Sequence, residues 1–270
     1  MTFRSHIEIA GRKIGPGEPV YIIAEIGLAH LGSLDLALLA AEWAAKAGAD
    51  ALKTQAFNPS NAEWLYSGPR KWWRMLPSIF ELKHHCEKLG LHLLVTPHDE
   101  WALSNVVRGW DLPAVKIGSG ERGNWDFIRH CAEWRRPMIV SLGGYSRRDT
   151  LKLVNTIEAS GNDQLALLHC VSKYPIMNDE DLKLDEIDRL AMRHSGPVGY
   201  SCHWNPMKRP EAVAHNAVIM GANIIERHIG PVIDPSVDSS NDLRVATYLR
   251  NFRWYVEAIR KAEKCHASVS

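Results

Sequence analysis

The feature that most limits the fold of this chain is the segment 21–57, where an apolar strand, a turn, an Ala-rich helix and a second apolar strand follow one another. The two-residue period of a strand places Glu25 on a face with apolar residues, and puts Lys53 and Gln55 together on one face of the second strand. A buried charge is costly unless it is paired or holds a ligand. Glu25 and Lys53 therefore form a structural ion pair or belong to a site at the carboxyl ends of parallel strands, where α/β enzymes build their sites.

The rest of the chain repeats this alternation of strand and helix. The predicted helices lie at residues 78–89, 100–108, 125–134, 147–160, 184–194 and 210–220, with a closing helix at 243–262. After the first two strands, further strands are predicted at residues 91–96, 113–117, 137–142, 165–170, 198–200 and 223–226. Eight strands alternating with helices predict a (β/α)8 TIM barrel, which usually needs about 250 residues. An open doubly wound sheet is the alternative, but no GxGxxG turn follows the first strand.

Two short alternating runs joined through Gly11 predict a β-hairpin at residues 6–19, within an N-terminal segment 1–19 that could plug the amino end of a barrel. The 270 residues are 46% hydrophobic, which is enough for one large core. The sequence contains no recognisable linker. We therefore expect a single catalytic domain spanning residues 1–270.

Charge and cysteine content limit the functional class. Lysine and arginine (32) nearly balance aspartate and glutamate (31), so no nucleic-acid or membrane partner is indicated and any anion site must be local. The chain has no N-terminal signal peptide and no apolar run of the roughly 18 residues that a membrane span needs. Its five cysteines are scattered without a CxxC pair, which fits a cytoplasmic protein with reduced thiols.

If the barrel closes, the polar residues that end its strands meet at one mouth. Besides those of the first two strands they are Thr96, His98, Lys116, Ser119, Glu121, Ser141, His169, Ser172, Lys173, Tyr174, Ser201, His203, Glu226 and His228, with His30 and Asp238 in flanking loops. Two lysines, several hydroxyls and the glycine turn at 118–121 suit a small multiply charged anion such as a phosphate or a phosphate-carboxylate. The histidines at 203 and 228, on adjacent strands, suit a divalent metal.

A long irregular segment at residues 58–77 follows the strand that carries Lys53. It contains four aromatic side chains, Trp64, Tyr66, Trp72 and Trp73. A loop of this length in a compact domain is usually functional, so it is either a substrate lid or an aromatic loop packed on its own barrel.

In these positions the sequence resembles the N-acetylneuraminate (sialic acid) synthase family, whose members condense phosphoenolpyruvate with an open-chain amino sugar. The matching phrases are IAEIG at 23–27, AGADALKTQ at 47–55, VTP at 95–97, VKIGSGE at 115–121, LLHCVSKYP at 167–175, VGYSCHW at 198–204 and IIERHI at 224–229. They occur in the family's order and cover nearly the whole predicted barrel.

The resemblance implies roles for individual residues. The phosphoenolpyruvate site maps to Lys53, Thr96, Lys116, Ser119, Ser141 and Ser201. The divalent metal, manganese with magnesium or cobalt as alternatives, maps to His203 and His228. Positions that meet the sugar or the reacting water map to Glu25, Gln55, Tyr174 and Asp238, and we add Glu121 and Lys173 as candidate substrate contacts. Glu25, Lys53, Lys116, His203 and His228 are the expected catalytic set.

Several departures from the family pattern fall on the acceptor side. Ala29 stands where the family has asparagine, Lys173 replaces another asparagine, Cys202 replaces an aspartate, and Ser239 follows Asp238 in place of histidine. The family's C-terminal antifreeze-like domain, which caps the partner's site, is not expected in this chain. The resemblance implies a homodimer, with a capping partner supplied in trans as a further expectation. Because lysine brings a positive charge where asparagine is neutral, Lys173 either predicts an anionic acceptor other than N-acetylmannosamine or is a loop lysine turned out to solvent.

The predicted activity is a metal-dependent transfer that joins phosphoenolpyruvate to a sugar aldehyde, forms a C–C bond and releases phosphate. One alternative is a metal-free aldolase in which Lys53 or Lys116 forms a Schiff base. The other is a catalytically idle barrel that serves another sugar enzyme as a scaffold.

Overall fold

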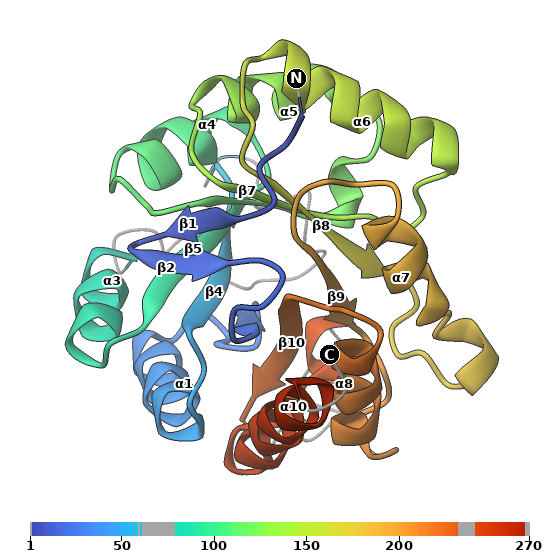
Figure 1. Ribbon diagram of the computed structural model, residues 1–270. Helices are drawn as coiled ribbons and strands as arrows, with labels where there is room; N and C mark the ends of the chain where they lie inside the picture. Colours follow the sequence, from blue (N-terminus) through green and yellow to red (C-terminus); the bar gives the residue numbers. More distant parts are fainter. Residues whose placement is uncertain (1, 59, 61–78, 232–240, 268–270) are drawn as a thin grey trace.

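The computed structural model describes residues 2–58, 60, 79–231 and 241–267, with the side chains of residues 266 and 267 left out. Within these residues, eight parallel strands form a closed barrel (Figure 1). They are β3 (Tyr21–Gly27), β4 (Ala51–Ala56), β5 (His92–Pro97), β6 (Val115–Ile117), β7 (Met138–Ser141), β8 (Leu165–Cys170), β9 (Val198–Cys202) and β10 (Ile224–Gly230). The barrel closes where β10 pairs in parallel with β3, from Ile224 beside Tyr21 to His228 beside Glu25. The prediction of a (β/α)8 barrel is confirmed.

Helices surround the barrel between consecutive strands (Figure 1). They are α1 (Leu34–Ala47), α3 (Ile79–Lys88), α4 (Glu100–Ala102) with the π-helix η3 (Leu103–Arg108), α5 (Trp125–Glu133), α6 (Arg147–Ala159), α7 (Asp185–Ala191), α8 (Pro210–Ile219) and α10 (Phe252–Ala267). The first helix illustrates how the sequence builds them. The Ser33 side chain accepts a hydrogen bond from the Leu36 N–H at its start, its buried alanines recur at helical spacing, and Gly48 ends it in the left-handed conformation.

The N-terminal hairpin pairs β1 (Ile7–Ile9) with β2 (Arg12–Ile14) in antiparallel register. Its isoleucines Ile7, Ile9 and Ile14 are almost completely buried and pack in one cluster with barrel-lining residues such as Tyr21 and Ile224. The hairpin therefore plugs the amino end of the barrel, as the sequence predicted. A larger apolar cluster fills the layer between the strands and the helices.

The predicted closing helix at 243–262 is wrong. This region contains α9 (Asn241–Val245), β11 (Thr247–Tyr248), the 3-10 turn η6 (Leu249–Asn251) and α10. The short strand β11 pairs with the end of β10, and the Thr247 hydroxyl accepts a hydrogen bond from the buried guanidinium of Arg227. A continuous helix is excluded, because Thr247 and Tyr248 are paired as a strand. The buried Arg227 guanidinium needs hydrogen-bond acceptors, and Thr247 supplies one of them.

Other boundaries also differ. Strands β9 and β10 continue to Cys202 and Gly230, beyond their predicted ends at 200 and 226, because their polar end residues are buried in the barrel. The predicted helix at 100–108 is mostly π-helix, and α7 is shorter than predicted.

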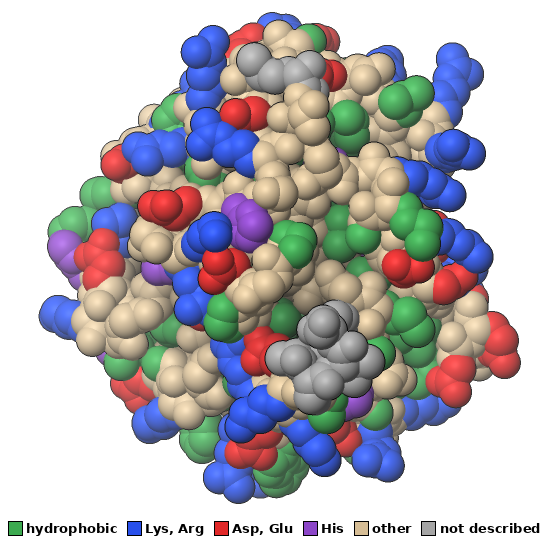
Figure 2. Space-filling model, in the orientation of Figure 1, with side chains coloured by type: hydrophobic (Ala, Val, Ile, Leu, Met, Phe, Trp, Pro, Cys, Tyr) green, Lys and Arg blue, Asp and Glu red, His purple; other side chains and the backbone are tan. Residues whose placement is uncertain are grey.

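The outer surface of the molecule is mixed in charge. In the face drawn in Figure 2, lysine and arginine side chains are interspersed with aspartate and glutamate. This agrees with a formal net charge of only +1. Within the described residues, no helix has the length and apolar character required for a membrane crossing.

Candidate active site

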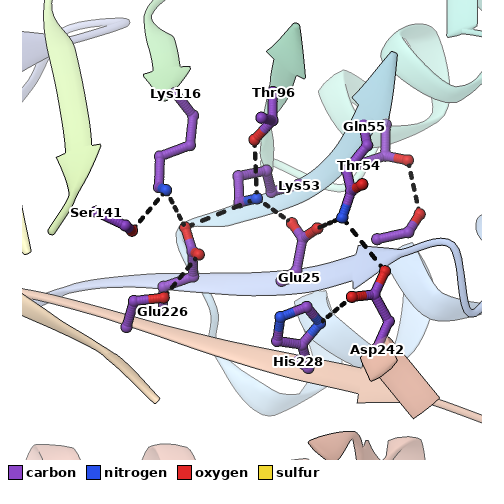
Figure 3. A network of polar contacts seen from close by, with 12 residues as sticks. Glu25, Lys53, Thr54, Gln55, Thr96, Lys116, Ser141, Glu226, His228 and Asp242 are labelled. Atoms are coloured by element: carbon purple, nitrogen blue, oxygen red, sulfur yellow. Dashed lines mark hydrogen bonds and ion pairs between the residues drawn. The ribbon is translucent and has the colours of Figure 1, made fainter. Parts of the chain in front are cut away.

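The carboxyl end of the barrel contains a buried network of charged side chains (Figure 3). The Lys53 ammonium lies 2.6 Å from Glu25 Oε2 and 3.8 Å from Glu226 Oε2, and it donates to the Thr96 hydroxyl at 3.1 Å. The Lys116 ammonium lies 3.7 Å from the same Glu226 oxygen. The charged side chains of this network are at most 5% exposed. The ion pair and the site that we considered as alternatives for Glu25 and Lys53 thus coincide in one network.

Hydroxyl groups complete the surroundings of Glu226 and Lys116. Lys116 Nζ donates to Ser141 Oγ at 2.8 Å and to its neighbouring backbone carbonyl, and the Ser201 hydroxyl donates to Glu226 Oε1 at 3.1 Å. Glu226 therefore serves as a shared counterion for both lysines. Sequence reasoning had placed Glu226 at a strand end without assigning it this role.

The two lysines have different electrostatic environments. Burial tends to lower the pKa of Lys53, but the carboxylates of Glu226 and Glu25 outweigh it and raise the pKa above its usual value. The pKa of Lys116 is lowered, because burial dominates and Glu226 offsets it only partly. Burial would raise the pKa of Glu226, but Lys116 and Lys53 overcome this effect and hold it at about 2. Lys116 is thus the cation whose charge is less fully compensated, and an anionic ligand beside it would supply the missing compensation.

Serine side chains and a glycine lie beside Lys116 and form a small polar surface. The Ser119 hydroxyl, in the turn η4 (Ser119–Glu121), accepts a hydrogen bond from the Gly143 N–H at 2.9 Å. A Cβ at Gly143 would lie 2.2 Å from Ser172 Oγ and 2.5 Å from Ser119 Oγ, so only glycine lets these hydroxyls approach the backbone. Hydroxyls and a lysine arranged in this way can hold phosphate or carboxylate oxygens.

The predicted metal ligands His203 and His228 lie next to each other at the mouth, with ring centroids 5.4 Å apart. His203 Nδ1 lies 2.9 Å from the Val171 carbonyl oxygen, which can only accept a hydrogen bond. Nδ1 therefore carries the proton, and the lone pair on Nε2 is available to bind a metal. Burial lowers the pKa of His203 to about 3 and that of His228 to about 4, so both rings are neutral. His228 Nδ1 is buried without a hydrogen-bond partner and lies 3.8 Å from Asp242 Oδ1.

These features fit a divalent metal. Neutral imidazoles are common ligands of divalent ions, and two rings at this separation could share one ion. Within the described part of the chain, no third His, Cys, Asp or Glu joins them to form a metal-binding group. The remaining ligands would therefore come from water, substrate or residues outside the described ranges.

The acceptor side of the mouth is organised around Gln55. Its amide nitrogen lies 3.4 Å from Glu25 Oε1 and 3.3 Å from Asp242 Oδ2 (Figure 3). The Asp242 side chain is 14% exposed and also accepts from the Leu28 N–H at 3.0 Å. A Cβ at Gly27, which has a φ of 49°, would lie 2.4 Å from Asp242 Oδ2. Glycine is thus required for Asp242 to reach this position.

Sequence reasoning missed Asp242, because it lies just before the predicted closing helix, in a region where only Asp238 had been singled out. Of the other predicted acceptor-side residues, Tyr174 packs against His203 with ring centroids 4.0 Å apart and the ring planes tilted by 32°. Lys173 is 56% exposed and its ammonium lies 2.7 Å from Asp181 Oδ1, so a carboxylate of the chain already balances its charge. His169 is not brought to this group, because it stacks on Tyr200 and contacts the Leu182 carbonyl.

Two predicted elements cannot be placed. Asp238 lies outside the described residues, and so does nearly all of the aromatic segment 58–77, of which only Asn58 and Ser60 are described. The remaining predicted site residues, with Glu121 discussed below, all lie at the carboxyl end of the barrel.

The fold and this network define a (β/α)8 barrel with a buried, charged site at the carboxyl ends of its strands. A model of the NeuB family matches residues 70–270. The chain belongs to the NeuB family, which confirms the resemblance to sialic acid synthases.

Individual relatives are similar over most of the chain. Protein MJ1065 of Methanocaldococcus jannaschii is 31% identical, with 96% of this chain and 75% of that protein covered. Human N-acetylneuraminate-9-phosphate synthase is 32% identical, with 81% of this chain and 64% of that protein covered. The crystal structure of N-acetylneuraminic acid synthetase from Leptospira borgpetersenii in complex with citrate superposes with a TM-score of 0.82 at 29% identity, covering 98% of this chain and 90% of that one.

Proposed function

We propose that this protein condenses phosphoenolpyruvate with an open-chain sugar aldehyde to give a 2-keto-3-deoxy sugar acid and phosphate. Family membership supports a sugar-acid synthase, and two of the named relatives are synthases of N-acetylneuraminic acid or its 9-phosphate. The chain covers 64% of the human enzyme, and the proposal leaves the identity of the sugar aldehyde open.

The observation that carries the proposal is the imbalance around Lys116. Two buried ammonium groups share Glu226, and Lys53 has Glu25 as a second carboxylate at 2.6 Å. Among the described residues, the Lys116 ammonium contacts hydroxyl and carbonyl oxygens besides Glu226. A phosphate or carboxylate bound there would compensate its charge in a site that is closed to solvent.

Phosphoenolpyruvate carries both of these anionic groups. Lys53, Thr96, Lys116, Ser119, Ser141 and Ser201 are the residues we assign to binding it. They come from five strands and the turn η4, so the barrel fixes their relative positions without needing a mobile loop. Holding the donor in this way orients its C3 carbon toward the acceptor side of the mouth.

His203 and His228 would hold the divalent metal, manganese or alternatively magnesium or cobalt. When bound, such an ion supplies Lewis-acid polarisation of the aldehyde oxygen.

The reaction forms one C–C bond and breaks one C–O bond. The electron pair of the donor's double bond forms the bond from C3 to the aldehyde carbon, and the aldehyde oxygen takes up a proton. The oxygen of a water molecule adds at C2 and loses one proton, which leaves a hydroxyl and the phosphate on the same carbon. The C2–O bond to phosphate then breaks as phosphate leaves with its electron pair, and the C2 hydroxyl gives up its second proton, which the phosphate can take, to become the keto group. Glu25, with one oxygen on Lys53 and the other on Gln55, is placed to orient or deprotonate that water or an acceptor hydroxyl.

One observation favours a second candidate. The lowered pKa of Lys116 is a property of lysines that act as Schiff-base nucleophiles. In such an aldolase, the Lys116 amine would attack a keto acid, lose water and form an imine, and phosphate would play no part.

The two functions are separated by following the phosphate. We expect the purified protein to release inorganic phosphate from phosphoenolpyruvate only when a sugar aldehyde is added. The product should contain one three-carbon unit from phosphoenolpyruvate and one molecule of the aldehyde. Borohydride should trap no protein adduct. If borohydride inactivates the protein in the presence of a keto acid and Lys116→Met prevents this, the aldolase is correct.

A further inference from the structure

His98 bridges two side chains that we assigned to the acceptor side. It follows β5 and its side chain is 27% exposed. Its Nε2 atom lies 3.2 Å from Gln55 Oε1, and its Nδ1 atom lies 3.3 Å from Glu121 Oε1. His98 was noted in the sequence as a strand-end residue and received no role.

The orientation of the Gln55 amide can be deduced from its neighbours. One end of this amide faces two carboxylate oxygens, Glu25 Oε1 and Asp242 Oδ2, which only accept hydrogen bonds when ionised. The NH2 group must therefore occupy that end, and the carbonyl oxygen must face His98. It follows that His98 Nε2 carries a proton and donates it to Gln55.

The other ring nitrogen faces an acceptor too. Glu121 is largely buried, and its second oxygen accepts from the Asn124 amide at 3.0 Å. The first oxygen is left for His98 Nδ1, which must donate to it if Glu121 is ionised. The charged groups around His98 in the described structure are Glu121 on η4 and, across Gln55, Glu25 on β3 and Asp242 on α9. All three are carboxylates, and Glu25 is also paired with the Lys53 ammonium at 2.6 Å, so Glu121 is the carboxylate that contacts the ring directly.

We propose that His98 is a positioning residue that stays doubly protonated and locks Gln55 between Glu25 and Asp242. One N–H fixes the Gln55 amide, and the other holds the ring on Glu121. The charge on the ring is the condition for both contacts, because a neutral imidazole has only one N–H. The effect of this arrangement on turnover rests on the proposed condensation, whereas the protonation state of the ring does not.

The protonation state is tested directly on the wild-type protein without substrate. In protein labelled with 15N-histidine, both ring nitrogens of His98 should show bound protons near neutral pH. In Glu121→Gln, the new amide can donate to Nδ1, so the ring should carry a proton on Nε2 alone. A wild-type ring with a single N–H would overturn the proposal, since Glu121 would then be the protonated partner.

The positioning role is tested with His98→Phe, which keeps a ring of similar size and removes both N–H groups. We expect kcat/KM for the sugar aldehyde to fall by about tenfold or more, while KM for phosphoenolpyruvate changes by less than about twofold. The side-chain amide signals of Gln55 should shift in the same variant. His84→Phe is the matched control, because His84 is exposed on α3 and its ring nitrogen lies beside the carboxylate of Glu87.

The outcomes distinguish the two proposals. Unchanged acceptor kinetics together with unchanged Gln55 signals in His98→Phe would rule out a positioning role. If none of the tested sugar aldehydes reacts with phosphoenolpyruvate in the wild-type protein, the proposed function fails. The nitrogen spectrum of His98 still decides the protonation state of its ring in that case.

Discussion

The amino end of the barrel is filled by the isoleucines of the hairpin, whereas the carboxyl end buries lysines and carboxylates. Charged groups are present at the amino end as well, where Arg12 and Arg260 both contact Asp50. Those side chains are 17–34% exposed, while the charged side chains Glu25, Lys53, Lys116 and Glu226 are at most 5% exposed. Charged side chains at the amino end therefore remain partly exposed to solvent, whereas those at the carboxyl end are almost completely buried.

This difference separates stability from function. Apolar burial at the amino end stabilises the fold at about 25 cal/mol per Å² of buried area. A buried ionic network contributes little net stability, because desolvation cancels much of the Coulomb attraction, and apolar residues of similar size would often be more stabilising. The charged network is therefore better explained by a ligand than by the needs of the fold. The following experiments test that division.

The largest expected effect is at the two histidines. His203→Ala and His228→Ala should each abolish condensation and weaken manganese binding, because removing one of two imidazoles leaves too few protein ligands to hold the ion. His84→Ala on α3 should change neither property. Calorimetric metal titration and activity before and after EDTA treatment provide the measurement. Full activity in EDTA-treated wild-type protein would contradict the metal assignment.

The second effect concerns the two lysines. Lys53→Met and Lys116→Met should each weaken phosphoenolpyruvate binding by about 2–5 kcal/mol, the usual cost of losing a buried charge pair. Their stabilities should differ, because Lys53→Met leaves Glu25 without its near cation while Glu226 keeps Lys116, whereas Lys116→Met removes a cation with a lowered pKa. Urea unfolding and ligand titration measure the two properties. Equal affinity for phosphoenolpyruvate in wild type and variants would remove both lysines from the binding site.

The third experiment perturbs the opposite end. Ile9→Ala removes a fully buried side chain from the hairpin and should lower the free energy of unfolding by about 2–5 kcal/mol. Activity per folded molecule should stay at the wild-type level, because Ile9 lies in the amino-end cluster. A large loss of turnover in the folded variant would show that the two ends are coupled.

The smallest effect is expected at Lys173. If its charge selects an anionic acceptor, Lys173→Asn should lower activity with that acceptor by about tenfold relative to a neutral aldose, which corresponds to about 1.4 kcal/mol. The ion pair with Asp181 argues for a smaller change, because the ammonium is already balanced and more than half exposed. Competition between neutral and anionic aldoses is the measurement. An unchanged ranking would assign Lys173 to the surface.

The sequence by itself determined the barrel, the plugging hairpin and the burial of Glu25 and Lys53. All three depend on local periodicity, since the two-residue period of a strand and the spacing of helices report directly which faces are buried. The order of phrases along the strands was likewise enough to place the chain in the NeuB family.

Only the tertiary structure decided how these residues are connected. Glu226 became the shared counterion of two lysines because β10 closes the barrel against β3 and brings it opposite Lys53 and Lys116. Asp242, on the short helix α9, meets Gln55 on β4 and the Leu28 N–H beyond β3, although these residues are far apart in the chain. Such contacts join residues that are distant in the chain, and they depend on strand register and barrel closure, which local sequence patterns do not encode.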